Sequence, residues 1–258
     1  MVHYDEAEAR KTDRIYQTPD IARQRLHTID ALGLGAGERV LDVGCGTGLL
    51  ARDMAALVGP TGRVVGIDIS AAMLAFAERR CADLPQVDLK LGTAEGLSAE
   101  DSGFDAVACT QVLLYVADVA GAVAQMHRVL KPGGRLVVIE TDWRGTVLHS
   151  VDDALTRRIF AAWDTAVPSP NLPVLLSPLL RAQGFSVSRV EAIPIVNRSR
   201  TPGNFSVGML EQFAIFARKQ GTASDAEAQA WLDDLRAKDE DGAYFFCVNR
   251  FLFTAVKR

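Results

Sequence analysis

A glycine-rich turn near the start of the chain constrains the fold more than any other feature. Residues 40–48 read VLDVGCGTG: an apolar run ends, three glycines follow at alternate positions, and a helical pattern starts at Leu49. Glycine permits positive φ and close approach of a ligand to the backbone, and a helix start offers unpaired N–H groups. This order predicts a strand, a tight turn and a helix, with a ligand site at the carboxyl end of the strand.

Further apolar runs follow the turn and alternate with helical patterns. The runs cover residues 63–69, 87–91, 104–110 and 135–141. The helical patterns cover 49–57, 70–80 and 119–130. Runs that are apolar on both faces and separated by helices are typical of a parallel sheet with helices on both sides. We therefore expect a doubly wound, Rossmann-like α/β fold.

The last third of the chain has a different pattern. Helical patterns at 150–166 and 173–183 lead to a weakly alternating run at 185–193, as in an edge strand, whereas the run at 242–256 is apolar on both faces and should lie inside the sheet. Between these runs lie two more helical patterns, at 205–219 and 224–238. A connection this long, about 197–241, is expected to form a helical cap.

Composition argues against several classes of function. The chain has 28 Lys and Arg against 32 Asp and Glu, a net charge of −4, and no basic run, which disfavours a nucleic-acid substrate. The apolar runs are too short to cross a bilayer, and the polar first 14 residues do not resemble a signal peptide. The cysteines are widely spaced, which predicts free thiols, a cytoplasmic location and no metal site; they are Cys45, Cys81, Cys109 and Cys247.

Two acids decide which ligand the turn favours. Asp42 precedes the first glycine by two residues, and Asp68 ends the next strand 26 residues later, where a carboxylate can accept both hydroxyls of a ribose. A dinucleotide site needs the third glycine one place later, where Leu49 stands. Asp42 would repel a pyrophosphate but attract a cationic amino group or sulfonium. The spacing therefore favours S-adenosylmethionine (AdoMet) over NAD.

Several segments then match one family in order and spacing. They are VLDVGCGTG (40–48), the strand end at Asp68, GTAEGL (92–97), FDAVACTQVLLYV (104–116) and RVLKPGGRLVVIETDW (128–143). As a set they resemble the class I AdoMet-dependent methyltransferases, and more narrowly the ubiquinone/menaquinone-methylase-like group (methyltransferase type 11). The resemblance covers about residues 37–143.

The resemblance implies a cofactor site for AdoMet and its product, S-adenosylhomocysteine. Asp42 and the glycine loop would hold the methionyl part, Asp68 the ribose, and Ile69 and Met73 the adenine. Thr93 stands where the family often has Asp, which weakens the contact to the adenine amino group. The implied cofactor residues are Asp42, Gly44, Cys45, Gly46, Gly48, Asp68, Ile69, Met73, Thr93, Ala94, Glu95, Thr110, Gln111 and Tyr16.

The resemblance also implies how the rest of the fold is arranged. The sheet would have seven strands, with the last one, 242–256, antiparallel between the fifth and the 185–193 strand. The helices after Pro202 and an N-terminal helix at 21–32 would roof the active site, and Tyr16 would cover the cofactor. We expect one domain over 1–258. Its parts are an N-terminal cap segment (1–36), an AdoMet-binding half (37–143) and a substrate half (144–258).

Catalytic side chains are harder to identify, because the methyl group of AdoMet is already activated and no triad is required. Gln111, after the fourth strand, and His149, after the fifth, are the candidates for the methyl-transfer site. Asp142, Trp143 and Arg144 also leave the functional end of the fifth strand, and Tyr115 follows the fourth. The residues for which a structural role is favoured are His127, Tyr244 and Asn197.

The predicted function is methyl transfer to an O, N or C centre of a small molecule. Two alternatives stay open: an AdoMet-fold enzyme that catalyses a different reaction, and an NAD(P)-dependent enzyme. The nucleic-acid amino-methylation motif is absent, because Thr110-Gln111-Val112-Leu113 stands in its place. Arsenite methylation is disfavoured because only Cys109 lies near the expected site. No sequence feature identifies the acceptor or an oligomer interface.

Overall fold

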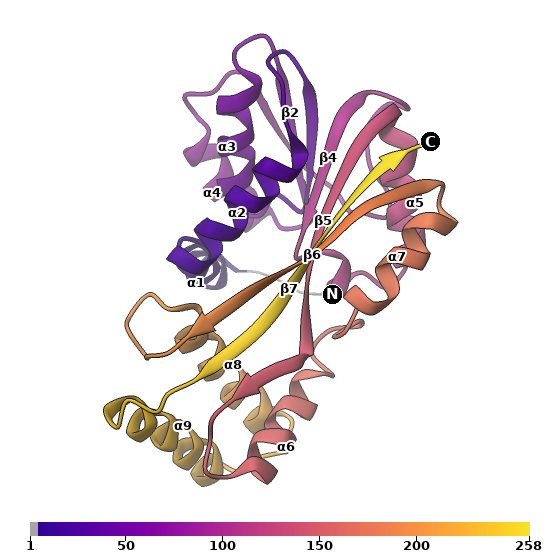
Figure 1. Ribbon diagram of the computed structural model, residues 1–258. Helices are drawn as coiled ribbons and strands as arrows, with labels where there is room; N and C mark the ends of the chain where they lie inside the picture. The colour runs from indigo at the N-terminus through magenta and orange to yellow at the C-terminus, as the bar shows by residue number, and fades with distance from the viewer. Residues whose placement is uncertain (1–4) are drawn as a thin grey trace.

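The computed structural model describes residues 5–258 and contains one seven-stranded sheet (Figure 1). Its strands are β1 (Arg39–Val43), β2 (Arg63–Asp68), β3 (Val87–Leu91), β4 (Phe104–Thr110), β5 (Leu130–Leu148), β6 (Phe185–Asn197) and β7 (Phe246–Lys257). They lie in the order β3-β2-β1-β4-β5-β7-β6, and β7 pairs antiparallel with both β5 and β6. The doubly wound sheet and the place of its last strand are therefore confirmed.

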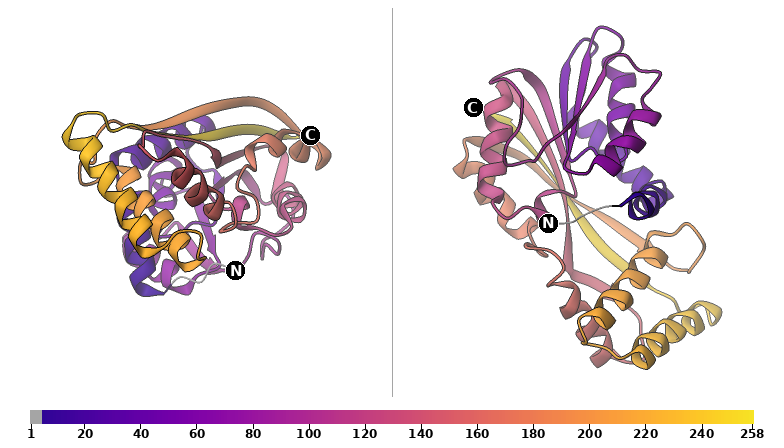
Figure 2. Two further views of the ribbon diagram at one scale, coloured as in Figure 1. Left: turned by 90° about the horizontal axis from the view of Figure 1, so that it is seen from below. Right: turned by 180° about the vertical axis from the view of Figure 1, so that it is seen from behind.

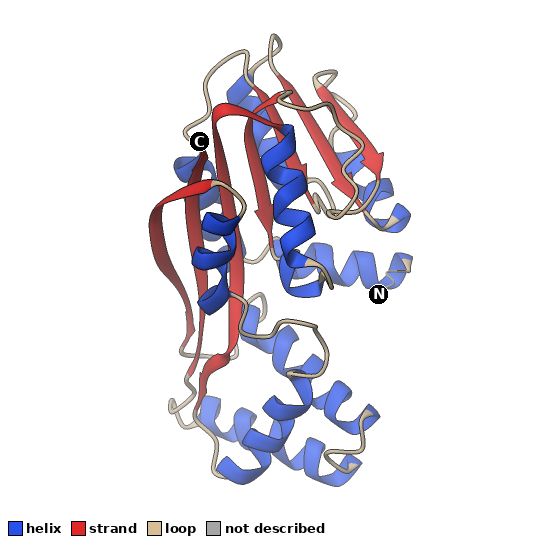
Figure 3. Ribbon diagram, turned by 90° about the vertical axis from the view of Figure 1, so that its right-hand side faces the viewer, coloured by secondary structure: helices blue, strands red, loops and turns tan. Residues whose placement is uncertain are grey.

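Helices cover both faces of the parallel part of the sheet (Figures 1 and 3). On one face, α2 (Pro19–Leu32) and α3 (Leu49–Val58) pack against inward-facing strand residues such as Val40 and Val64. On the other face, α5 (Val119–Val129) and α7 (Pro173–Ala182) pack against Leu41 and Val65. The alternation along each strand thus supplies one apolar surface to each layer of helices.

A second hydrophobic cluster lies beyond the main body, where β5, β6 and β7 extend past the parallel strands (Figures 1 and 2). There α6 (Asp153–Trp163), α8 (Phe205–Lys219) and α9 (Asp225–Glu240) pack on one another around Trp143, Trp163 and Phe213. The predicted helices of the insertion are confirmed. The fifth strand is longer than the predicted 135–141, because its irregular stretch between Asp142 and Val147 does not end its pairing with β7.

The N-terminal segment contains one helix more than the pattern predicted. Helix α1 (Glu6–Tyr16) begins with a capping box, in which Asp5 accepts from the Glu8 N–H at 2.8 Å and Glu8 accepts from the Asp5 N–H at 3.1 Å. Tyr16 is the last residue of this helix rather than part of a loop.

The remaining helices are α4 (Ala71–Arg80) and a short 3-10 turn, η1 (Leu113–Tyr115). Ser70 is the N-cap of α4 and accepts from the Met73 N–H at 3.2 Å. Across residues 5–258, none of the helices combines the length and the apolar composition that crossing a bilayer requires.

Candidate functional site

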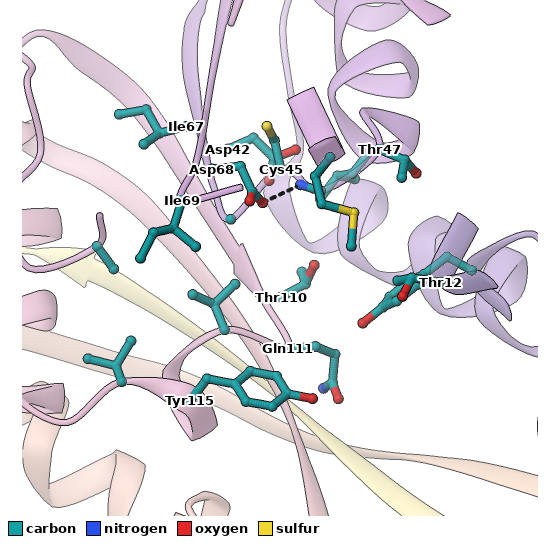
Figure 4. Close-up of a pocket in the computed structure, with 18 of the residues that line it drawn as sticks. Thr12, Asp42, Cys45, Thr47, Ile67, Asp68, Ile69, Thr110, Gln111 and Tyr115 are labelled. Atoms are coloured by element: carbon teal, nitrogen blue, oxygen red, sulfur yellow. Dashed lines mark hydrogen bonds between the residues drawn. The ribbon is translucent and has the colours of Figure 1, made fainter. Parts of the chain in front are cut away.

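A cavity of about 410 Å³ opens at the carboxyl ends of β1, β2 and β4 (Figure 4). Its walls come from the glycine loop, the ends of β2 and β4, the turn after β3, and helices α1 and α2. The predicted cofactor residues among its lining are Tyr16, Asp42, Gly44, Cys45, Gly46, Asp68, Ile69, Met73, Thr93, Ala94, Glu95, Thr110 and Gln111. The fold therefore brings together segments that lie up to about 95 residues apart in the chain.

The glycine loop is folded back onto the end of β2. The Ile67 carbonyl accepts from the N–H groups of Gly44 and Cys45, at 2.7 and 3.0 Å. Gly44, Gly46 and Gly48 all have positive φ. Gly48 is the one predicted cofactor residue that does not line the cavity: a Cβ there would lie 2.8 Å from that of Ala77, so this glycine lets α3 and α4 approach each other.

Two carboxyl groups lie at this end of the cavity, that of Asp42 buried and that of Asp68 partly buried. Asp68 accepts from the Gly46 N–H at 2.8 Å and from the Ser70 N–H at 2.9 Å. Asp42 is 1 % exposed, and its Oδ2 has no hydrogen-bond partner. Burial, with the negative charge of Asp68, raises the pKa of Asp42 to about 7, and burial also raises the pKa of Asp68. A cationic group at this end would give Asp42 the partner it lacks.

Gln111 lies at the opposite end of the cavity from Asp42 and Asp68, next to Tyr115 (Figure 4). Its φ of 58° is unusual for a residue other than glycine. Its side-chain oxygen accepts from the Thr141 hydroxyl, and its Nε2 donates to the Ile139 carbonyl at 3.2 Å. The amide is therefore fixed at both ends and is suited to positioning a ligand rather than to moving a proton.

The loop after Gln111 is held by a carboxyl group that the sequence did not single out. Glu140 on β5 is fully buried, and its Oε1 accepts from the N–H groups of Val112 and Leu113 at 3.0 and 2.7 Å. Burial raises the pKa of Glu140 to about 8. Its only sequence signal was an acid at the centre of an otherwise apolar strand.

His149 requires a correction, because it does not reach the cavity. The pairing of β5 with β7 continues to Leu148, which carries His149 towards the helical cluster around α6. Its side chain is exposed, and its Nδ1 lies 2.8 Å from the Ala243 carbonyl oxygen. The prediction had assumed a strand that ends near residue 141.

Of the other side chains that the sequence suggested for the site or for a structural role, Tyr115 lines the cavity and the following three do not. His127 packs edge-on against Phe185, with ring centroids 5.1 Å apart. Trp143 is buried in the aromatic cluster, and Arg144 pairs with Asp164 at 2.8 Å. These three residues stabilise the fold around the site and do not contact it.

Tyr244 and Asn197 also have structural partners, as the sequence favoured. The Tyr244 hydroxyl donates to Ser206 at 2.8 Å, and Asn197 Nδ2 donates to Asp20 at 2.9 Å. The predicted roof over the site is corrected in part. Helix α2 covers the cavity as predicted, together with α1, but no residue of α8 or α9 lines it. Those two helices bury their apolar faces against α6 and the long strands.

Comparison with known proteins agrees with this geometry. A family model described as a methyltransferase domain matches residues 41–138. An uncharacterized 37.1 kDa protein of a Streptomyces fradiae transposon is 36% identical over 243 residues, which cover 92% of this chain and 68% of that protein. The chain belongs to the class I AdoMet-dependent methyltransferases. Within them it is of the ubiquinone/menaquinone-methylase-like group, and AdoMet is the cofactor.

Two further relatives of this methyltransferase show how far the likeness extends. The demethylmenaquinone methyltransferase of Symbiobacterium thermophilum is 43% identical over 107 residues, so the chain matches 43% of that protein's length with 40% of its own. The solved structure of the cyclase SpnF has a TM-score of 0.61 and 27% identity, covering 92% of this chain and 81% of that one. The likeness covers less than half of the chain in the first case and most of it in the second.

The cavity fits AdoMet on structural grounds. The unpartnered Oδ2 of buried Asp42 suits the cationic amino group, and a Cβ at Gly46 would meet no protein atom within 4 Å, which leaves room for a ligand against the loop. Ile69, Met73 and Ala94 offer apolar contacts beside Asp68, as an adenosine needs.

Proposed function

We propose that this methyltransferase acts on a nucleophilic O, N or C atom of a small-molecule acceptor. The observation that supports this proposal most is the shape of the cavity, which continues past the acidic cofactor end to Gln111, Tyr115 and Pro168. Space enclosed by a few polar side chains suits a small molecule rather than a polymer. The net charge of −4 gives no support for a nucleic-acid acceptor.

The residues of this chain would divide the work between binding and orientation. Asp42, Asp68 and the glycine loop would hold AdoMet, which when bound supplies a methyl group whose bond to sulfur breaks with the electron pair left on sulfur. Gln111, fixed by Thr141 and Ile139, would orient the acceptor in line with that bond. Helices α1 and α2 would exclude water from the cavity.

We further propose that residues 37–143 form the cofactor half and 144–258 the substrate half, with acceptor contacts also from the segment 1–36, which supplies Tyr16 and Gln24. The free cysteines of the described chain, three of them buried, support a reducing location such as the cytoplasm.

The likeness to a cyclase keeps a second function open. At 27% identity over 92% of the chain, SpnF supports a reaction in which the fold serves a ring closure rather than methyl transfer. The two functions differ in the mass of the product. Methyl transfer adds one CH₂ to the acceptor, whereas a cyclisation gives an isomer.

A labelling experiment tests the proposal. Purified protein is incubated with AdoMet bearing a trideuterated methyl group and a fractionated small-molecule extract, and products are followed by mass spectrometry. Calorimetry with S-adenosylhomocysteine runs in parallel. We expect cofactor binding and label in one acceptor, with both weakened by at least roughly tenfold in Asp68→Ala. Absence of cofactor binding, or an isomeric product without label, would overturn methyl transfer.

A further inference from the structure

The charges around the cavity are divided between its two ends. Asp42 and Asp68 line the cofactor end, whereas Arg250 on β7 does not line the cavity but contacts the side-chain oxygen of Gln24, which does. The pKa of Tyr16 is affected by charges from both sides. Burial has the largest effect and raises the pKa of Tyr16, the positive charge of Arg250 lowers it, and the negative charge of Asp68 raises it.

Arg250 is a buried cation without a carboxylate partner. It is 2 % exposed and faces Thr141 on β5 and Ile193 on β6 in the middle of the sheet. Its Nη1 donates to the Gln24 side-chain oxygen, its Cζ lies 5.0 Å from the centre of the Phe205 ring, and its Nε has no partner. Within residues 5–258, no Asp or Glu oxygen lies within 4.0 Å of it. Removing a guanidinium from water without a counter-charge is costly, so a ligand is the expected source of one.

The nearest acids do not supply that counter-charge. Glu140 and Asp20 affect the pKa of Arg250 only from a distance, and neither forms an ion pair with it. Glu140 Oε1 is taken by two backbone N–H groups, and its pKa of about 8 keeps most of it protonated near neutral pH. Asp20 Oδ2 accepts from Asn197 and from the Phe205 N–H.

The side chains around Arg250 leave hydrogen-bond donors facing the cavity. The Gln24 side-chain oxygen accepts from Arg250, which leaves the Gln24 NH₂ group as a donor. The Gln111 oxygen accepts from Thr141 and its Nε2 donates to the Ile139 carbonyl, which leaves one N–H bond of that amide. Burial keeps the Tyr16 hydroxyl protonated, and Tyr16, Gln24 and Gln111 all line the cavity. A set of donors beside a buried cation complements an anion with several lone pairs.

We propose that the end of the cavity formed by Gln24, Gln111 and Tyr115 binds a carboxylate of the acceptor molecule, with Arg250 behind Gln24 as its counter-charge. This inference rests on the proposed function and names the chemical class of the acceptor. Asp42 would then be the counter-charge for the cationic part of the cofactor, and Arg250 the counter-charge for the anionic part of the acceptor.

Matched pairs of small molecules test the inference. Protein saturated with S-adenosylhomocysteine is titrated calorimetrically with 4-hydroxybenzoate and 4-hydroxybenzamide, and with octanoate and octanamide. In at least one pair we expect the carboxylate to bind roughly tenfold or more tightly than the amide. Equal affinities in both pairs, or no binding of either carboxylate, would overturn the proposal.

Variants test whether Arg250 causes the preference for a carboxylate over the matching amide. Arg250→Met should remove the preference for the carboxylate, Arg250→Lys should keep part of it, and Gln24→Leu should reduce it without removing the buried charge. Arg236→Met, which removes an exposed arginine on α9, is the matched control and should behave as the wild type. If Arg250→Met does not fold, Gln24→Leu alone decides, and an unchanged preference in it would count against the proposal.

The cofactor titration separates the two proposals. If S-adenosylhomocysteine fails to bind, the proposed methyl transfer fails. If it binds and the carboxylates are not preferred, only the inference about the acceptor fails.

Discussion

Asp68 Oδ2 accepts a hydrogen bond from the Gly46 N–H at 2.8 Å, so the acid at the end of β2 is joined directly to the glycine loop after β1. Its other oxygen accepts from the Ser70 N–H at the start of α4. One carboxylate therefore holds the turn after β1 and the turn after β2 in fixed positions relative to each other, and both turns face the cofactor site.

Asp68→Ala should weaken binding of S-adenosylhomocysteine by at least roughly tenfold, because it removes the ribose contact and releases the Gly46 and Ser70 N–H groups. Calorimetry measures the affinity. Asp88→Ala is the control, since Asp88 pairs with Arg63 outside this cavity. Wild-type affinity in Asp68→Ala would contradict the assigned role.

The buried Asp42 carboxyl should make the unliganded protein less stable as the pH rises. Its pKa is about 7 in the folded protein and near 3.8 in an unfolded chain. Between these values the folded state holds a proton that the unfolded chain has released, so the free energy of unfolding falls as the pH rises towards 7. Asp42→Asn should gain about 2 kcal/mol relative to wild type between pH 5 and pH 7, at roughly 1.4 kcal/mol per pH unit. Urea unfolding at both pH values tests this, and parallel pH profiles would count against it.

Two glycines of the same loop should respond differently to alanine. At Gly48 the new Cβ would lie 2.8 Å from that of Ala77 and the residue has a φ of +79°, so stability should fall by about 2–4 kcal/mol. At Gly46 the Cβ would meet no protein atom within 4 Å, so the loss should be about 1 kcal/mol from backbone strain. Gly46→Ala should instead reduce cofactor affinity, because its Cβ would occupy the cavity. Denaturation and calorimetry of both variants measure the contrast; equal losses of stability would refute it.

His149→Ala should leave kcat/KM for the acceptor within about twofold of wild type, because its imidazole is exposed and bonded to the Ala243 carbonyl. Steady-state kinetics with the acceptor found by labelling would measure this. A tenfold loss would show that the ring reaches the site after all.

Local patterns predicted most of the residues that line the cavity, because each of their signals is short in sequence. The VLDVGCGTG turn, Asp68 and the segment from Thr93 to Glu95 lie at strand ends, where any doubly wound sheet brings them together. Helix α1 was missed although its capping box, Asp5 with Glu8, is readable, because few apolar residues mark its buried side.

The acceptor half was less predictable, because it depends on contacts between distant segments. Gln24 and Arg250 meet across 226 residues, and only the folded sheet brings them together. Arg250 lies within the apolar run at 242–256, and a charged residue in such a run indicates that a polar group packs against it in the fold. The position of His149 outside the cavity could not be predicted from the sequence, because it depends on how far the pairing of β5 with β7 extends.

The long strands β5, β6 and β7 contribute residues to all three hydrophobic clusters of the described chain, and this restricts how a ligand could enter. Bending between the main body and the cluster around α6, α8 and α9 would break the ladder of hydrogen bonds that these strands share, so a hinge there is costly. The cavity is covered from the other side by α1, which is tied to α4 by the pair between Asp13 and Arg80 at 2.9 Å. Entry of a ligand would therefore depend on movement of α1 rather than on bending of the long strands.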